Sequence, residues 1–130
     1  MQGTTGRGRK AMWGPGDAYP TVNWLHDISY LFGGAFIANA VPHFVSGMMG
    51  RPFQSPFAKP PGKGLSSSTV NVLWGFANFV IAYLLIARVG EFDIHAADQV
   101  IAAGIGVLLL GVFSARSFGQ FHGGNSPAGS

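Results

Sequence analysis

The chain has 130 residues, of which 48% are hydrophobic and only 10% charged, with a formal net charge of +3. Soluble domains carry about 25% charged residues, so this composition indicates a membrane protein. The lack of cysteine excludes disulfides, thiolate metal sites and cysteine nucleophiles. The only basic cluster is Arg7, Arg9 and Lys10, which argues against nucleic-acid binding.

The first predicted segment, residues 1–23, is a glycine-rich tail that ends in an interfacial stretch. Four aromatic residues that carry a polar N–H or O–H group surround the start of the first apolar run: Trp13, Tyr19, Trp24 and Tyr30. Such rings settle at the boundary between lipid and water. We therefore expect an anchoring belt at the entrance to the first membrane span.

Residues 24–49 are predicted to form the first transmembrane helix, because positions 28–49 carry no formal charge. Pro42 lies inside this helix and is expected to kink or break it, since proline lacks a backbone N–H. A cleaved signal peptide is the competing interpretation, because Ala38-Asn39-Ala40 resembles a cleavage site. Such a signal of about 40 residues would exceed the usual roughly 15–30, which favours an uncleaved helix.

His43 is an ionisable side chain at membrane depth, which is a functional hypothesis by default. Asn39, His43 and Gly47 are spaced four apart and share a face if the helix continues past Pro42. Two interpretations stay open. Either the imidazole ligates the metal of a haem or chlorophyll, or it lies at the wet interface and bonds a carbonyl or an asparagine.

Residues 50–68 form a connector rich in proline, phenylalanine and basic residues. Its prolines exclude a regular helix and favour extended or turn conformations. The side chains expected to contact lipid head groups or a partner subunit are Arg51, Phe53, Phe57, Lys59 and Lys63. A phosphate-binding loop is a weaker alternative, because the Gly62-Lys63-Gly64 stretch lacks the glycine spacing of a P-loop.

Residues 69–89 are the second predicted span, preceded by three serines and uncharged except near the C-terminal end. Asn71, Trp74 and Asn78 share one helical face, and Gly75 beside them allows a close neighbour. Asparagine in hydrocarbon must find a partner. The face is therefore either an interhelical hydrogen-bonding seam or a polar lining for a ligand or cofactor.

Residues 90–96 are predicted to form an acidic turn. Asp93 and His95 in this turn are potential metal ligands. A metal site needs three or four converging groups, however, so a solvated turn is the competing interpretation.

Residues 97–117 are the third predicted span, and residues 118–130 are a C-terminal tail. Gly104, Gly111 and Ala115 form a small-residue face on this span. Small residues let helix backbones approach closely, so this face is expected to pack on another helix of the chain or of a neighbouring subunit.

The predicted fold is all-α, an integral membrane protein with three transmembrane helices and Gly/Pro-rich tails. No converging catalytic or metal-binding group can be assembled from the scattered acids and histidines, so an enzyme is not expected. The leading hypothesis is a small non-catalytic subunit that packs on and stabilises a larger membrane complex, photosynthetic or respiratory. Its expected partners are other membrane subunits and lipids.

Two alternatives remain. The first is a binder of a cofactor, pigment such as chlorophyll, haem or lipid, in a polar seam between the first two helices. Its residues would be Asn39, His43, Asn71, Trp74 and Asn78. The second is a membrane enzyme acting at head-group level, with His43, Arg51 and Lys59 near the lipid phosphates.

The expected location is a bacterial cytoplasmic or intracytoplasmic membrane. Lysine and arginine residues divide four against four between the two sides: Arg7, Arg9, Lys10 and Arg88 against Arg51, Lys59, Lys63 and Arg116. The positive-inside rule therefore does not decide the orientation. The basic cluster before the first helix favours a cytoplasmic N-terminus.

Overall fold

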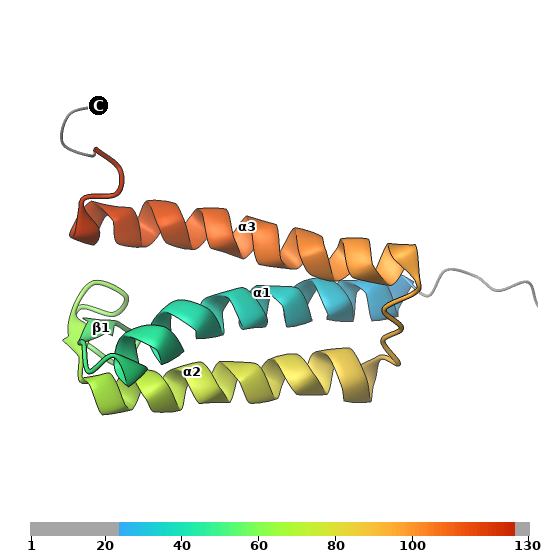
Figure 1. Cartoon of the computed structure of the whole chain (residues 1–130), viewed down its shortest axis with the longest axis horizontal. Coiled ribbons are helices and arrows are strands. Elements are labelled where there is room, and N and C mark those ends of the chain that lie inside the picture. Colours follow the sequence, from blue (N-terminus) through green and yellow to red (C-terminus); the bar gives the residue numbers. More distant parts are fainter. Residues whose placement is uncertain (1–23, 127–130) are drawn as a thin grey trace, which may run out of the picture.

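A computed structural model describes residues 24–126, and this part of the chain is mostly helical (Figure 1). Its elements are α1 (Trp24–Met48), β1 (Phe53–Gln54), β2 (Leu65–Ser66), α2 (Ser68–Tyr83), the π-helical extension η1 (Leu84–Val89) and α3 (Ala97–His122). Two of the expected belt residues, Trp13 and Tyr19, and the basic cluster Arg7, Arg9 and Lys10 lie outside the described residues.

Three helical segments are long and apolar enough to span a membrane, with mean hydropathies of 1.3, 1.9 and 1.9: Trp24–Met48, Ser68–Val89 and Ala97–His122. At 1.5 Å per residue, each can cross a hydrocarbon core of roughly 30 Å. The predicted all-α class with three transmembrane helices is thereby confirmed. The structure extends the third helix to His122, beyond the predicted end at residue 117.

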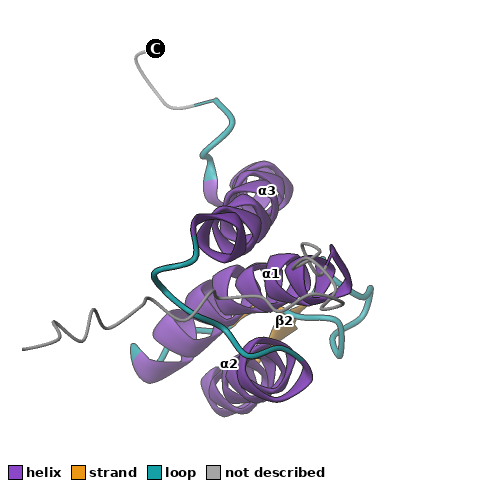
Figure 2. Cartoon of the chain, turned by 90° about the vertical axis from the view of Figure 1, so that its right-hand side faces the viewer, coloured by secondary structure: helices purple, strands orange, loops and turns teal. Residues whose placement is uncertain are grey.

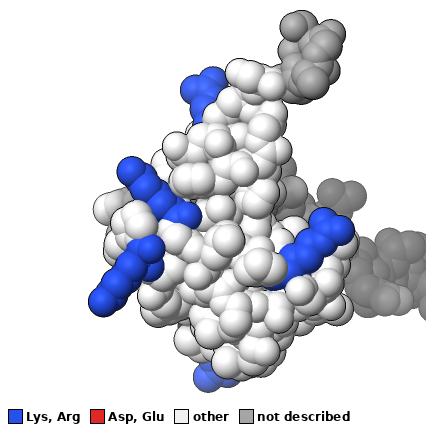
Figure 3. Space-filling view, turned by 90° about the vertical axis from the view of Figure 1, so that its left-hand side faces the viewer, with Lys and Arg blue, Asp and Glu red and all other residues white. Residues whose placement is uncertain are grey.

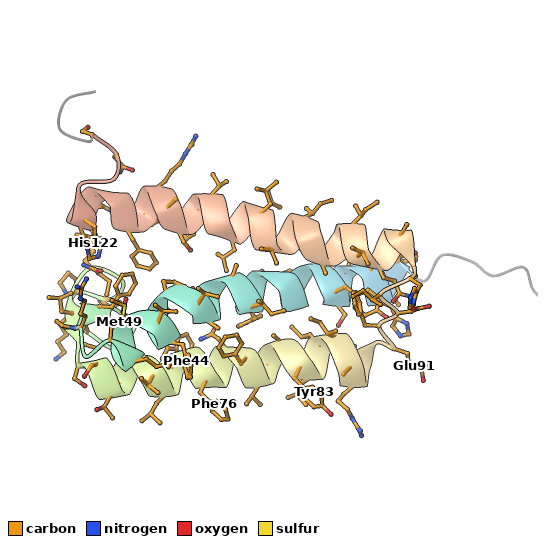
Figure 4. The ribbon with its side chains drawn as sticks, viewed as in Figure 1. Phe44, Met49, Phe76, Tyr83, Glu91 and His122 are labelled. Carbon is orange, nitrogen blue, oxygen red and sulfur yellow. The ribbon has the colours of Figure 1, made fainter. Side chains whose placement is uncertain are left out.

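The three helices form a single layer with α1 in the middle (Figures 1 and 2). Both α2 and α3 pack along α1, whereas they make little contact with each other. Each outer helix therefore turns most of its surface away from the layer. Figure 4 shows Phe44 between α1 and α2, while Phe76 and Tyr83 point away from α1.

Glycines set the close packing of α1 against α3. A Cβ atom on Gly34 would collide with the backbone carbonyl of Ala103, and one on Gly106 would collide with that of Leu31. The two helix backbones therefore touch here, as small residues permit in membrane bundles. Gly75 plays the same part between α2 and α1, because its Cβ would lie 2.7 Å from that of Phe44.

The predicted small-residue face of the third helix makes no close helix contact within the chain, although Gly111 and Ala115 line an open groove of about 330 Å³ beside Pro42 of α1. Gly104 and Gly111 are exposed, and a Cβ on either glycine would meet no atom within 4 Å; Ala115 follows them on the same face. The reason is that α3 turns a different face, that of Ala103 and Gly106, toward α1. Contact with a neighbouring subunit through this face stays a prediction.

Helix α1 continues through Pro42 without a break, so His43 lies inside the helix, and the alternative of a kink at Pro42 stays a prediction. Ser67 caps the start of α2, since its hydroxyl accepts a hydrogen bond from the Val70 N–H at 3.2 Å. Helix α3 ends at Gly123, which adopts a left-handed backbone with φ of 76°.

The connector folds into a small hairpin against the helix ends. Strands β1 and β2 pair antiparallel, with Phe53 opposite Ser66 and Gln54 opposite Leu65. Phe53 is only 9% exposed, which disfavours the predicted contact with lipid or a partner, and that contact stays a prediction. Phe53 packs inside its own chain, because the hairpin turns it toward α1 and α3.

The other predicted contact residues of the connector remain on the surface. Phe57 is 61% exposed, and Arg51, Lys59 and Lys63 are exposed as well. Figure 3 views the hairpin end and shows basic side chains with no acidic side chain on that face. These residues stay available for lipid head groups or a partner.

Candidate functional site

The polar residues predicted to share a seam do meet between α1 and α2. Asn71 and Asn78 are 0% exposed and His43 is 2% exposed. The His43 Nδ1 lies 2.9 Å from the Asn71 Oδ1, and the Asn39 Nδ2 donates to the Asn78 Oδ1 at 2.9 Å. These two links join α1 to α2 where the helix spacing predicted a polar face.

The Asn71 side chain has its orientation fixed by three backbone carbonyls. Its Nδ2 donates to the carbonyl oxygens of Phe53, Ser66 and Ser67 at 3.2, 3.1 and 3.0 Å. The amide oxygen must therefore face His43 and accept the hydrogen bond. It follows that the Nδ1 of His43 carries the proton and acts as the donor.

This tautomer leaves the second ring nitrogen of His43 with a free lone pair when the imidazole is neutral. Within residues 24–126 the Nε2 atom takes part in no hydrogen bond. A histidine whose Nδ1–H is held by an amide oxygen presents its Nε2 as an acceptor or as a metal ligand.

Aromatic rings surround His43 on several sides. Its ring centroid lies 5.4 Å from that of Phe53, 6.4 Å from that of Trp74 and 6.0 Å from that of Phe118, all edge-on. The Trp74 Nε1 is buried and is the only such side-chain polar atom in the described part of the chain without a partner. An indole N–H is a donor only, so this group lacks an acceptor.

A cavity of about 220 Å³ opens beside these groups. It is lined by Asn39, His43, Gln54, Ser55, Pro56, Gly62, Trp74 and Phe118. Three of the five predicted binding residues are on this wall. Asn71 and Asn78 do not line it and instead hold His43 and Asn39 in place.

A residue that the sequence did not indicate holds Gln54, which lines the cavity. His122, at the end of α3, bonds the side chain of Gln54 with 2.9 Å between Nε2 and Oε1 and stacks on Phe53 at 5.3 Å. Figure 4 shows it beside the hairpin. The available signal was Gly123, whose position after His122 is typical of a helix end and would have extended the third helix.

The remaining predicted candidates do not converge. Among residues 24–126 no group of three or more potential metal-ligating side chains occurs, and the Asp93–His95 pair, 3.2 Å apart, is exposed at the opposite end. Arg51 and Lys59 do not line the cavity beside His43. Comparison of the chain with protein-family models, curated proteins and solved structures found no match.

Proposed function

We propose that the protein is a small, non-catalytic transmembrane subunit that packs on and stabilises a larger membrane complex, of the photosynthetic or respiratory kind. The observation that carries the proposal is the outward small-residue face of α3. A Cβ atom on Gly104 or Gly111 would meet no atom of the chain within 4 Å, although small residues in membrane helices typically serve close helix contacts. A helix of a neighbouring subunit would fill this face.

The hydrogen bonds of the polar seam support a structural role for most of its residues. The amides of Asn71 and Asn78 are both engaged, the second through its Nδ2 to the Trp74 carbonyl at 2.7 Å. Ser29 similarly donates to the Leu85 carbonyl at 2.6 Å and ties α1 to η1. Groups satisfied in this way stabilise helix packing rather than perform chemistry.

The protein is proposed to lie in a bacterial cytoplasmic or intracytoplasmic membrane with a cytoplasmic N-terminus. The three spans support a location in a membrane, whereas the bacterial origin and the type of membrane are part of the proposal. The orientation rests on the basic cluster near the N-terminus, because the full count of lysine and arginine is balanced.

Purification of the tagged chain in mild detergent tests the subunit role. We expect other membrane proteins to co-purify at fixed stoichiometry, and Gly104→Leu to reduce their recovery at least about tenfold by blocking the close approach. Ala87→Leu adds bulk at an exposed position on η1 and should leave recovery unchanged. A lone monodisperse chain, or equal loss in both variants, would contradict the proposed face.

A second candidate function, ligand binding, is favoured by the cavity that His43 lines and by the Nε2 of this histidine, which takes part in no hydrogen bond within residues 24–126. The size of the cavity disfavours a haem or chlorophyll ring. Pockets that enclose drug-sized ligands are roughly 300–1,000 Å³, and this one, about 220 Å³, is smaller. The site suits a small ring or the head group of a lipid-like molecule.

A further inference from the structure

Two side chains on the cavity wall are buried and still have a hydrogen-bonding atom without a partner. His43 is 2% exposed and Gln54 is 4% exposed, and both line the cavity. Among residues 24–126 neither the His43 Nε2 nor the Gln54 Nε2 takes part in a hydrogen bond. Neither atom is fully enclosed by protein, because in this part of the chain the Trp74 Nε1 is the only fully buried side-chain polar atom without a partner. A molecule in the cavity can therefore reach both atoms.

The hydrogen bonds around these two side chains decide which atom donates and which accepts. Asn71 holds the ring proton of His43 on Nδ1, so the Nε2 is an acceptor. The Gln54 Oε1 accepts from the His122 Nε2, so the amide N–H groups of Gln54 remain as donors. The wall therefore offers one acceptor from α1 and one donor group from the hairpin.

Asn39 adds a second acceptor to this wall. Its Nδ2 donates to the Asn78 Oδ1, and the orientation of Asn78 is fixed because its own Nδ2 donates to the Trp74 carbonyl. The Asn39 Oδ1 is left without a hydrogen bond within the described residues. Asn39 precedes His43 by one helical turn and lines the same cavity, so their Cβ atoms lie about 5–6 Å apart. One NH₂ group, with hydrogen bonds of about 2.9 Å, can bridge two acceptors at such a separation.

The cavity has the size and the walls of a site for a small flat ring. A cavity of roughly 150 Å³ in a protein core accommodates benzene, and this one has about 220 Å³. The rings of Trp74 and Phe118 line it from two helices, with centroids 6.4 and 6.0 Å from that of His43. Aromatic walls favour an aromatic ligand through offset or edge contacts.

We infer that the cavity binds a primary carboxamide carried on a small aromatic ring. The NH₂ group donates to the His43 Nε2 and the Asn39 Oδ1, and the carbonyl oxygen accepts from the Gln54 amide. A hydroxyl group has one proton and leaves one of the two acceptors unsatisfied, and a carboxylate has no proton to give either. The inference rests on the second candidate function, ligand binding, and is independent of the subunit role.

Equilibrium dialysis of radiolabelled benzamide against the purified full chain in nanodiscs tests the inference, with empty nanodiscs as the blank for partition into lipid. Acetophenone and phenol serve as competing analogues. Acetophenone replaces the NH₂ group of benzamide with a methyl group of similar size, and phenol offers a single hydroxyl. Benzamide should bind at least about tenfold more tightly than either analogue, because each of them leaves at least one buried acceptor without a donor.

Gln54→Met should weaken the binding of benzamide about tenfold, because it removes the amide donor at a similar side-chain length. Gln120→Met is the matched control, since Gln120 is exposed on α3 and donates to the Ser117 carbonyl. It should leave the affinity for benzamide unchanged. Circular dichroism verifies that both variants remain folded.

The possible outcomes separate the carboxamide from ligand binding in general. Equal or tighter binding of acetophenone or phenol, or an unchanged affinity for benzamide in Gln54→Met, would overturn the carboxamide inference and leave ligand binding standing. No saturable binding of any of the three compounds, because the cavity holds only water, would overturn both. None of these results would alter co-purification with a larger complex.

Discussion

Asn71 is the residue at which three elements of the chain are joined. Its amide nitrogen bonds carbonyls from the hairpin and from the start of α2, and its oxygen bonds His43 of α1. Both polar atoms of this buried side chain therefore form hydrogen bonds. Removing it would leave the buried Nδ1–H of His43 without its acceptor and would take one hydrogen bond from each of the carbonyls.

Asn71→Leu should therefore destabilise the protein by about 2–3 kcal/mol. An unsatisfied buried group costs roughly 1–3 kcal/mol, whereas single interhelical hydrogen bonds in membranes average about 0.6. Denaturant titration in detergent micelles, followed by circular dichroism, measures the change. Asn125→Leu removes an exposed bond to the Arg116 carbonyl and should change stability by less than about 0.5 kcal/mol. An equal loss of stability in Asn71→Leu and Asn125→Leu would show that the hydrogen bonds of Asn71 contribute little to the stability of the fold.

The sequence could predict which side chains of the site share a face of one helix, but not which segments far apart in the sequence meet there. Asn39, His43 and Trp74 were found because helical spacing places side chains on a face without knowledge of the fold. The contact between His122 and Gln54 spans 68 residues, which no periodicity encodes. The burial of Phe53 could not be predicted either, because an interfacial phenylalanine and a buried one look alike in a proline-rich connector.

At the level of elements, α1 is distinctive because it has a neighbour on each side. It uses Gly34 against α3, and Gly47 against α2, where a Cβ would lie 2.6 Å from Val72. The existence of three apolar helices followed from composition and length. The sequence could not predict which glycines of α3 face α1, because Gly104 and Gly106 are only two residues apart and both suit helix contact.

The two α3 glycines should respond oppositely to the same substitution. Gly106→Ala places a methyl group against the Leu31 carbonyl and should cost about 1–3 kcal/mol through overpacking. Gly104→Ala enters open space and should stabilise the isolated chain by about 0.5–1 kcal/mol through helix propensity. Thermal unfolding of both variants in the same detergent compares them. A destabilised Gly104→Ala with a neutral Gly106→Ala would reverse the assigned faces of α3.

Across the whole molecule, charge is divided between the two ends of the layer. The hairpin end carries Arg51, Lys59, Lys63 and Arg116, with no acidic residue among the described ones (Figure 3). The opposite end carries Asp27, Glu91, Asp93 and Asp98 with Arg88. Within residues 24–126 the layer therefore has a basic end and an acidic end, and each faces one side of the membrane.

Because the chain contains no cysteine, single cysteines can report which end faces which side. Lys63 and Asp93 are exposed at opposite ends, so Lys63→Cys and Asp93→Cys form a matched pair. With a cytoplasmic N-terminus, a membrane-impermeant maleimide applied to intact spheroplasts should label only Lys63→Cys, because three spans place residue 93 on the N-terminal side. Both should react after lysis. Labelling of Asp93→Cys alone would invert the orientation, and labelling of both in intact spheroplasts would contradict the transmembrane arrangement itself.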